Sequence, residues 1–456
     1  MTYKLNILVV FLIFVIIGGF FILHKSQPTE PLNISVSELS CPMFKCNIHR
    51  TGNLNFNPEK NDISSGMSSV GSNAPEGMER GILGKKDTFD PSPIFVDLDL
   101  DGIDEVITFY KNTIYNITTK SRPFHNFVMA IKYKENPTML EKLEFGEVPY
   151  IRYWYFVLPS EVHTSFSVGD LNKDNYPEIA FGCDDGNLYV LNKEGKLLFK
   201  FKTKGKVGST PAIADIDNDK KQEIIFGSDD NNLYCLDNEG KLKWKFESKG
   251  KMESSPAIFF HNNGAFITFG SDDRNFYILD GKGNLHCKFT TEGKIRSSPL
   301  FYKNKLVFGS DDRNIYLLDT NCNPIKKYIT EGRVRGSPAV FRNYFVIGSE
   351  DGNLYFLNEK EIRNLSLDSP IFSTPASLED KVLISTSNGK IYLTNLTSKK
   401  KIWENNLTEE FSCSPSLGNK YLFSCFFVQY ENNDQFAGIF ISSVNENYGK
   451  DTKVKI

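Results

Sequence analysis

The chain has 456 residues, enough for two or three average domains or for one large closed all-β domain. It contains 37 Phe and 20 Tyr, and 33 Gly and 20 Pro supply many turns, which favours a protein of many short strands. The formal net charge is only −3 and acids and bases are interspersed, so the sequence disfavours a nucleic-acid partner.

The first predicted element is an apolar segment near the N-terminus. Residues 5–23 contain no charged side chain and are long enough to cross the hydrocarbon core of a bilayer as a helix. The segment is longer than the apolar part of most signal peptides, and no small-residue cleavage site follows it closely. We therefore expect residues 1–25 to be an uncleaved signal-anchor that contacts the membrane through residues 5–23. A cleaved signal peptide is the alternative.

A repeated unit begins near Ser92 and recurs along the chain. Each unit has four short apolar runs separated by Gly, Asp and Asn turns, which is typical of a four-stranded antiparallel meander. Such a sheet cannot bury both faces alone, so the units must stack around an axis. The unit starts are Ser92-Pro93, Ser165-Phe166, Thr210-Pro211, Ser255-Pro256, Ser298-Pro299, Ser337-Pro338, Thr374-Pro375 and Ser414-Pro415.

These units define the predicted architecture. We expect an all-β fold, an about eight-bladed β-propeller of four-stranded antiparallel blades over residues 41–446, preceded by the N-terminal transmembrane helix. Residues 26–40 are expected to form a juxtamembrane linker and residues 447–456 a tail. Residues 60–89, rich in Ser and Gly, are expected to be a flexible crossing. Residues 111–163 are expected to be an enlarged first blade with insertions.

Three early units carry an acidic loop between their first and second strands, at 97–105, 170–178 and 215–223. Oxygens at loop positions 1, 3, 5 and 9, with a backbone carbonyl at position 7, can surround a hard cation that takes six to eight oxygen ligands. The alternative is a set of Asx-rich hairpin turns without a metal. The predicted calcium ligands are Asp97, Asp99, Asp101, Ile103, Glu105, Asp170, Asn172, Asp174, Tyr176, Glu178, Asp215, Asp217, Asp219, Lys221 and Glu223.

The three acidic loops differ at their bends. Gly102 stands at the sharp bend of the first loop, where Asn175 and Lys220 stand in the others. Lys220 and Lys221 also oppose a cation electrostatically, so the first loop is the favoured site. Loops of this kind fill with calcium in a millimolar-calcium compartment, which favours a propeller outside the cytoplasm, at the cell surface, in the periplasm or in a lumen.

The first unit carries extra sequence before the second begins. Residues 150–159 are rich in aromatic side chains, and insertions in repeat proteins often form binding faces. The predicted partner-binding residues are Arg152, Tyr153, Trp154 and Tyr155. The alternative is an extra strand or plug packed on the ring.

Residues 227–244 resemble the repeats of the quinoprotein-like propeller family, Gly-Ser-x-Asp-x-x-Leu-Tyr-x-Leu-Asp-x-x-x-Gly-x-x-x-Trp. The segment 41–52 is similar to the Trp-Pro-Met-Phe…Arg-Thr-Gly opening of such proteins, with Cys41 in place of Trp. The acidic loops resemble the calcium loops of integrin-type FG-GAP repeats. The resemblance implies a propeller, in which residues 41–58 supply the missing fourth strand of the last unit. The family's cofactor platform, catalytic acid and vicinal cysteine pair are not recognisable, so no PQQ is expected.

The eight cysteines are scattered without metal-binding spacing. Cys41/Cys46 and Cys413/Cys425 could form disulfides in an oxidising compartment, and the other cysteines are expected to be buried small hydrophobes. The recurring Asp-Asp pairs, such as Asp229-Asp230, are interpreted as turn-formers, because a catalytic pair is needed once and a turn in every blade.

The sequence therefore predicts a membrane-anchored, extracytoplasmic and calcium-braced scaffold that binds a protein or surface ligand of unknown identity without catalysis. Two alternatives stay open. One is an enzyme with a site in the propeller funnel, either a quinoprotein-like dehydrogenase or a sugar-processing enzyme. The other is a propeller of the outer-membrane assembly type.

Overall fold

The computed structural model describes residues 92–102, 104–113, 124–133, 150–262, 264–378, 381–395, 400–406, 414–415, 423–431, 434–442 and 453–455. The chain divides into two compact units, Met1–Ile34 and Ser35–Ile456, and every described residue belongs to the second. Within the described ranges we find no helix with the length and apolar character needed to cross a membrane. The expected membrane segment 5–23, the linker 26–40 and the crossing 60–89 lie outside these ranges.

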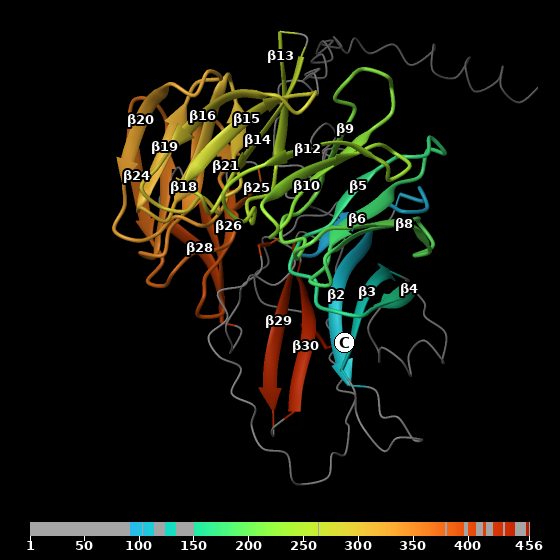
Figure 1. The fold of residues 1–456 in the computed structure, drawn as a ribbon. Helices are drawn as coiled ribbons and strands as arrows, with labels where there is room; N and C mark the ends of the chain where they lie inside the picture. The colour runs from blue at the N-terminus through green and yellow to red at the C-terminus, as the bar shows by residue number, and fades with distance from the viewer. Residues whose placement is uncertain are drawn as a thin grey trace, which may run out of the picture. The chain divides into compact units, whose positions relative to one another are not determined.

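Seven antiparallel sheets of four strands each follow one another along the chain, and each is one blade of a propeller (Figure 1). The first three blades are β1 (Ile94–Val96), β2 (Glu105–Thr113), β3 (Phe124–Tyr133), β4 (Tyr150–Leu158); β5 (Ser167–Gly169), β6 (Glu178–Gly182), β7 (Asn187–Leu191), β8 (Leu197–Lys202); and β9 (Ala212–Ala214), β10 (Glu223–Gly227), β11 (Asn232–Leu236), β12 (Leu242–Glu247). The fourth and fifth are β13 (Ala257–His261), β14 (Gly264–Gly270), β15 (Asn275–Asp280), β16 (Leu285–Thr290); and β17 (Leu300–Tyr302), β18 (Lys305–Ser310), β19 (Asn314–Leu318), β20 (Pro324–Ile329). The sixth and seventh are β21 (Ala339–Phe341), β22 (Tyr344–Gly348), β23 (Asn353–Leu357), β24 (Ile362–Ser366); and β25 (Ala376–Leu378), β26 (Lys381–Ser385), β27 (Lys390–Asn395), β28 (Lys400–Asn406).

The place of a strand in its blade follows from its hydrophobic pattern. The middle strands β10 and β11 read EIIFG and NLYCL and are buried at every position, because both their faces pack against neighbouring blades. The outer strand β12 reads LKWKFE and is exposed at alternate positions, as expected for an edge strand with one face toward solvent. The short first strands lie side by side, β5 with β9 and β9 with β13.

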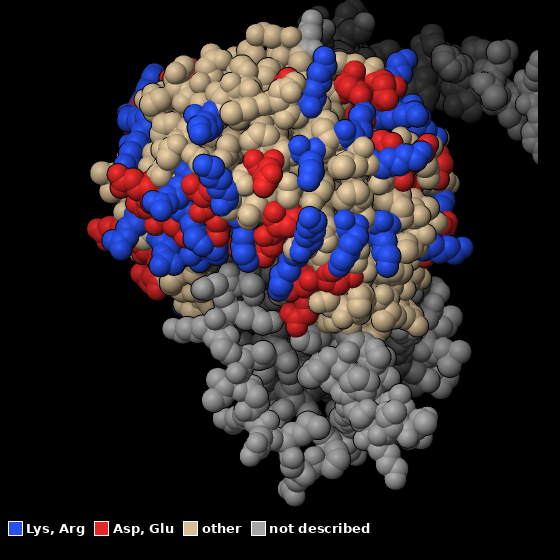
Figure 2. All heavy atoms as spheres, in the orientation of Figure 1, with Lys and Arg blue, Asp and Glu red and all other residues tan. Residues whose placement is uncertain are grey.

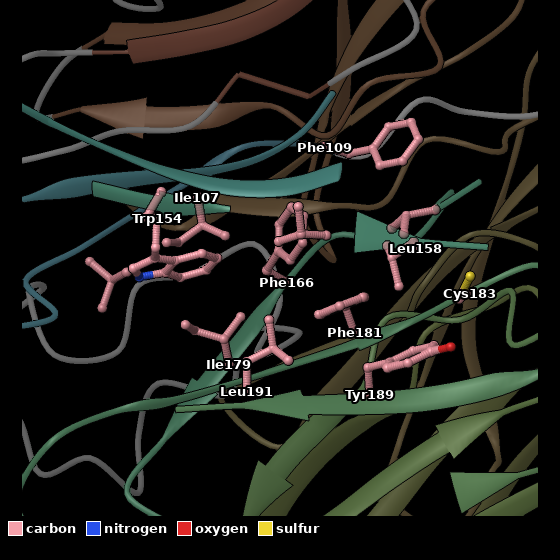
Figure 3. Close-up of a cluster of buried hydrophobic side chains, with 14 of the residues drawn as sticks. Ile107, Phe109, Trp154, Leu158, Phe166, Ile179, Phe181, Cys183, Tyr189 and Leu191 are labelled. Atoms are coloured by element: carbon pink, nitrogen blue, oxygen red, sulfur yellow. The ribbon is translucent and has the colours of Figure 1, made fainter. Parts of the chain in front are cut away.

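The core lies between blades. The cluster drawn in Figure 3 joins the first two blades and contains Ile107 and Trp154 from the first with Phe166, Phe181 and Tyr189 from the second. The ring of Phe181 stacks on that of Tyr189 with centroids 5.6 Å apart. Equivalent clusters join the later blades, so each blade completes its hydrophobic core only by packing against the next.

The Ser/Thr residues that start the units form a chain of hydrogen bonds from blade to blade. In each bond, the backbone N–H at one start donates to the side-chain hydroxyl of the next start. The bonds are Ser92 to Ser165 (3.3 Å), Ser165 to Thr210 (2.9 Å), Thr210 to Ser255 (3.0 Å), Ser255 to Ser298 (3.1 Å), Ser298 to Ser337 (3.1 Å), Thr374 to Ser414 (2.8 Å) and Ser414 to Ser92 (2.9 Å). The last of them joins the final unit start to the first blade, 322 residues earlier in the chain.

The prediction of about eight four-stranded blades is wrong, and the expected transmembrane helix before them lies outside the described residues. The strands after Ser414 form a three-stranded sheet, β29 (Phe423–Glu431), β30 (Asp434–Ser442) and β31 (Lys453–Lys455). β29 and β30 pair in register over nine residues, and β31 pairs with β30 as the third strand. The correct architecture is therefore seven four-stranded blades, with a three-stranded sheet and no helix in the rest of what is described.

Candidate functional site

The repeated Asp-Asp turns are structural ties between blades. In the third blade, Oδ2 of Asp230 accepts the Tyr234 hydroxyl at 2.7 Å and the backbone N–H of Lys204, from the preceding connection, at 2.9 Å. Hydrogen bonds from Tyr234 and Lys204 outweigh the effect of burial and lower the pKa of Asp230. The same Tyr–Asp bond occurs at Tyr189–Asp185, Tyr277–Asp273, Tyr316–Asp312 and Tyr355–Asp351.

The connections between blades and the Asp-Asp turns lie at the same end of the strands, because the strands of each blade alternate in direction. We call this end of the strands the entry end. Two small residues open each blade, and we call the residue just before them the entry position. Its occupants differ from blade to blade, whereas the residues that follow them are nearly constant. The entry-position residues are His163, Gly208, Glu253, Arg296, Arg335 and Phe372.

Three entry-position side chains are cations held between acids. The guanidinium of Arg296 forms two 3.0 Å hydrogen bonds to Asp272 and lies 3.2 Å from Glu253. Arg335 binds Asp311 in the same bidentate way, at 2.8 and 3.0 Å. Both side chains are largely buried, with 16% and 9% exposed, so these ion pairs are shielded from solvent.

The third cation is His163. Its Nε2 lies 3.4 Å from a Glu161 oxygen and 3.5 Å from an Asp184 oxygen. Burial opposes the charged imidazolium, but hydrogen bonding to Asp184 and Glu161 outweighs it and raises the pKa of His163 to about 9. His163 is therefore protonated at neutral pH. Sequence reasoning missed the entry position, although a variable residue two positions before each unit start was a visible signal.

The three acidic loops, at the opposite end, share one backbone conformation. The aspartate at position 1 accepts the N–H of position 6 in each loop, at 2.8 Å for Asp97, 3.1 Å for Asp170 and 2.8 Å for Asp215. Positions 4 and 6 have positive φ in all three loops. Glycine adopts a positive φ most easily, asparagine less easily and lysine least easily. The bend is therefore least strained at Gly102, more strained at Asn175 and most strained at Lys220.

In two of the loops a lysine ammonium lies among the carboxylates. Lys132 of β3 contacts Asp99, Asp101 at 2.9 Å and Glu105 at 3.2 Å. Lys243 of β12 likewise contacts Asp217 at 2.6 Å and Glu223 at 2.9 Å in the third loop. Ion pairing and hydrogen bonding outweigh burial and raise the pKa of both lysines. Each of these two loops therefore contains a cation supplied by the protein itself.

The loop 170–178 has no such lysine contact among its described side chains. The Asn172 amide instead donates to Asp174 at 3.0 Å and to Glu178 at 2.9 Å. Glu178 is buried, and burial together with the charges of Asp174 and Asp170 raises its pKa to about 7. Rotation of the Asn172 amide by 180° about its terminal bond would replace this donor with an oxygen ligand.

The oxygen atoms of the three acidic loops are chemically suited to bind a hard cation. Carboxylate oxygens of Asp97, Asp99 and Asp101 lie within 4.8 Å of one another, as do those of Asp215, Asp217 and Glu223. Glu105 is fully buried, and its Oε1 lies 3.2 Å from the Lys132 ammonium. The predicted carbonyl ligands Tyr176 and Lys221 are described, and each donates its N–H to the position-5 aspartate, whereas Ile103 lies outside the described residues.

The aromatic segment 150–159 forms β4, the outer strand of the first blade. Trp154 is only 9% exposed, and its Nε1 donates to the Lys193 carbonyl of the second blade at 2.7 Å. Tyr153 is half-buried against the same core, whereas Tyr155 is exposed. The side chain of Arg152 lies outside the described part. Of the predicted partner-binding residues, Tyr155 is the one that presents its ring to solvent.

The cysteines form a disulfide that sequence reasoning did not predict, between Cys287 of the fourth blade and Cys322 of the fifth. Cys183 and Cys235 are buried free thiols, as expected for small hydrophobes. The expected pairs Cys41/Cys46 and Cys413/Cys425 lie outside the described side chains. Figure 2 shows Lys and Arg interspersed with Asp and Glu over the visible face, with no large field of one sign.

Comparison with known proteins supports the propeller fold. A profile of the lambda-carrageenase beta-propeller domain matches residues 211–299, and no curated protein matches the chain. BamB from Moraxella catarrhalis has a similar structure, with a TM-score of 0.51, 13% identity, and coverage of 79% of this chain and 99% of that chain. The computationally designed Ika8 protein is similar too, with a TM-score of 0.52, 14% identity, and coverage of 78% and 98%. The chain is thus a β-propeller protein, and at these identities the likeness concerns the fold.

Proposed function

We propose that this protein is a non-catalytic binding scaffold whose entry end receives a protein partner. The supporting observation is the variation at the entry position. Residues with a structural task recur in nearly every blade, such as the Ser/Thr starts and the Tyr–Asp ties. The entry position instead changes between cation, acid, aromatic ring and glycine, so it serves no structural task common to the blades, as expected at the end of a propeller that is matched to one ligand.

The local geometry does not restrict which residue type can occupy the entry position. A Cβ atom added at Gly208 would lie 3.6 Å from Asp229 Oδ1 and 3.9 Å from Glu253 Cγ, so the backbone does not require glycine there. Partly exposed lysines surround the position, and each is paired with an acid of an Asp-Asp turn. A surface of paired charges fits a polar protein partner that brings charges of both signs.

Charge reversal at the entry end tests this proposal. Lys206, Lys251 and Lys294 have side chains 54%, 52% and 48% exposed, so changing all three to Glu leaves the core intact. Lys196, Lys241 and Lys282, exposed in turns at the opposite end, provide a control with the same change in net charge. Cross-linking in native extracts should capture a defined partner with the wild type and the control, and lose it with the entry-end variant. Equal capture by both variants would refute the proposal.

We propose further that calcium braces the propeller and binds most readily at loop 170–178. That loop combines three carboxylates, one of them buried, and none of the three forms an ion pair with a lysine among the described side chains, whereas Lys132 and Lys243 already neutralise the other two loops. Asp170, Asn172, Asp174, the Tyr176 carbonyl and Glu178 would hold the ion. Chelation should lower the melting temperature and calcium should restore it. An unchanged melting curve would exclude bracing.

We propose a location outside the cytoplasm. The Cys287–Cys322 disulfide supports it, because such bonds persist mainly in oxidising compartments. A reporter that is active only outside the cytoplasm, fused after residue 456, should be active. A signal only from a cytoplasmic reporter would contradict the proposal.

A second candidate is an outer-membrane assembly-type propeller. The likeness in fold to BamB over 99% of that chain favours it. Substitution of this chain for such a propeller in cells that lack their own should then restore outer-membrane protein levels. If the chain is stably produced and outer-membrane protein levels are not restored, this second candidate is excluded and the binding scaffold remains as the proposed function.

A further inference from the structure

A repeated contact joins each of the early blades to the next one. The middle residue of the outer strand packs its ring on a glycine in the turn between the third and fourth strands of the following blade. Trp154 covers Gly195, Phe199 covers Gly240 and Trp244 covers Gly283, and a Cβ atom at any of these glycines would meet the ring at 2.4–2.7 Å. Each glycine has positive φ, between 73° and 83°. The glycine is needed both for the turn and for the close approach of the ring.

The next junction has two cysteines in these same two places. Cys287 pairs with Ile278 in its sheet as Trp244 pairs with Cys235, so Cys287 occupies the ring position. Cys322 occupies the glycine position, since its φ is 61° and its N–H donates to the Asp319 carbonyl at 3.2 Å. The corresponding bond from Gly283 to the Asp280 carbonyl measures 3.0 Å. The disulfide joins these two residues, 35 positions apart in sequence.

We propose that the Cys287–Cys322 disulfide is a redox-dependent clasp that replaces the ring-on-glycine contact between the fourth and fifth blades. Two thiols bury much less apolar area than an indole on a glycine, so the reduced junction holds its blades together less strongly than its neighbours do. The stability of the ring then depends on the oxidation state at this one junction. At the following junction Lys326 takes the ring position and donates to the Glu359 carbonyl at 2.9 Å, a contact that reduction does not change.

The chemistry of the clasp is thiol–disulfide exchange. Closing it removes two protons and two electrons from the two thiols, and a disulfide of a small molecule or of an oxidoreductase accepts them and becomes two thiols. Opening follows the reverse route with a dithiol as the reductant. Cys322 is 7% exposed and Cys287 is half-buried, so an incoming thiolate attacks the Cys287 sulfur and Cys322 leaves.

Thermal unfolding with and without dithiothreitol tests the clasp, using the wild type, the variant C287A/C322A and the variant C287W/C322G. Dithiothreitol should lower the melting temperature of the wild type by about 5 °C, to that of C287A/C322A in either condition. The variant C287W/C322G rebuilds the ring-on-glycine contact and should melt near the oxidised wild type regardless of reductant. A wild-type melting temperature that dithiothreitol leaves unchanged would overturn the proposal.

Peptide mapping supplies a readout that does not depend on how well the variants fold. After denaturation without reductant in the presence of iodoacetamide, the oxidised wild type should yield a cross-linked pair of peptides containing Cys287 and Cys322, while Cys183 and Cys235 are alkylated. Alkylation of Cys287 and Cys322 in that sample would show that the clasp does not form. If Cys287 and Cys322 become alkylated only after dithiothreitol treatment, and as fast as the melting temperature falls, then reduction of this disulfide causes the loss of stability.

Discussion

Oδ2 of Asp230 accepts two hydrogen bonds at once, from the Tyr234 hydroxyl at 2.7 Å and from the Lys204 N–H at 2.9 Å. One carboxylate thus fixes the turn of its own blade and the connection that arrives from the preceding blade. Asp273 makes the equivalent pair of bonds with Tyr277 and Lys249. The acids that most resemble a catalytic pair in the sequence are therefore engaged in holding the blades together.

Removal of this tie should destabilise the propeller. Tyr234→Phe loses one hydrogen bond to a charged acceptor and should lower the free energy of unfolding by about 1.5–3 kcal/mol. Urea denaturation measures the change. Tyr155→Phe, at an exposed position, is the control and should lower the free energy of unfolding by less than Tyr234→Phe does. Equal effects of the two substitutions would mean that the Tyr234–Asp230 bond contributes nothing.

The aromatic residues of β4 should separate into a structural and a surface class. Trp154→Ala removes a buried ring between the first two blades and should cost about 3–5 kcal/mol. Tyr155→Ala should leave stability nearly unchanged, so binding assays on this segment should use Tyr155. Thermal and urea unfolding of the two variants, compared side by side, check the assignment, and an unfolded or strongly destabilised Tyr155→Ala protein would contradict it.

Stability should fall with alkaline pH because of His163. Its pKa is about 9 in the folded protein and about 6.5 when unfolded, so the folded state binds the proton more tightly. The stabilisation is fully present below about pH 6.5 and is lost as the pH rises through about 9. Urea unfolding at pH 6 and pH 10 should show a smaller difference for His163→Gln than for the wild type. The difference isolates His163 from other groups that titrate in this range.

Calcium should act through loop 170–178 before the other acidic loops. Asp174→Ala removes an exposed carboxylate of that loop and should abolish most of the rise in melting temperature that calcium produces after chelation. Asp101→Ala in the first loop should have a smaller effect, because Lys132 already neutralises its carboxylates. Titration calorimetry should give one strong site in the wild type and in Asp101→Ala. A full calcium response in Asp174→Ala would place the ion elsewhere.

Features repeated along the chain were predictable from sequence, and features that join distant repeats were not. The Ser/Thr-Pro starts and the apolar runs indicate the meander because every blade repeats the same short pattern of strands and turns. Lys132 and Asp99 are 33 residues apart, and Lys243 and Asp217 are 26 apart, so no local spacing connects these lysines with the acidic loops. Cys287 and Cys322 meet only because adjacent blades place the ring position beside the next turn.

The number of blades was mispredicted for a related reason. Ser414-Pro415 carries the start signal of a further blade and takes part in the hydrogen bonds that link the unit starts. A start signal fixes how a strand begins near the axis but not how many strands of the sheet follow it. β29 and β30 pair with each other and β31 adds one more strand, so the described sheet after Ser414 has three strands instead of four.

The Ser414 to Ser92 hydrogen bond joins residues 322 positions apart. Until the last unit has been synthesised, the first blade has no neighbour on its open side, and the inner strands there expose apolar surface and unpaired backbone groups. Loop closure over such a distance is entropically costly and slow, so the circle is expected to close last in folding. An emerging chain would therefore be most exposed to aggregation and proteolysis just before Ser414 arrives, because the row of blades becomes a ring only when the Ser414 N–H can reach the Ser92 hydroxyl.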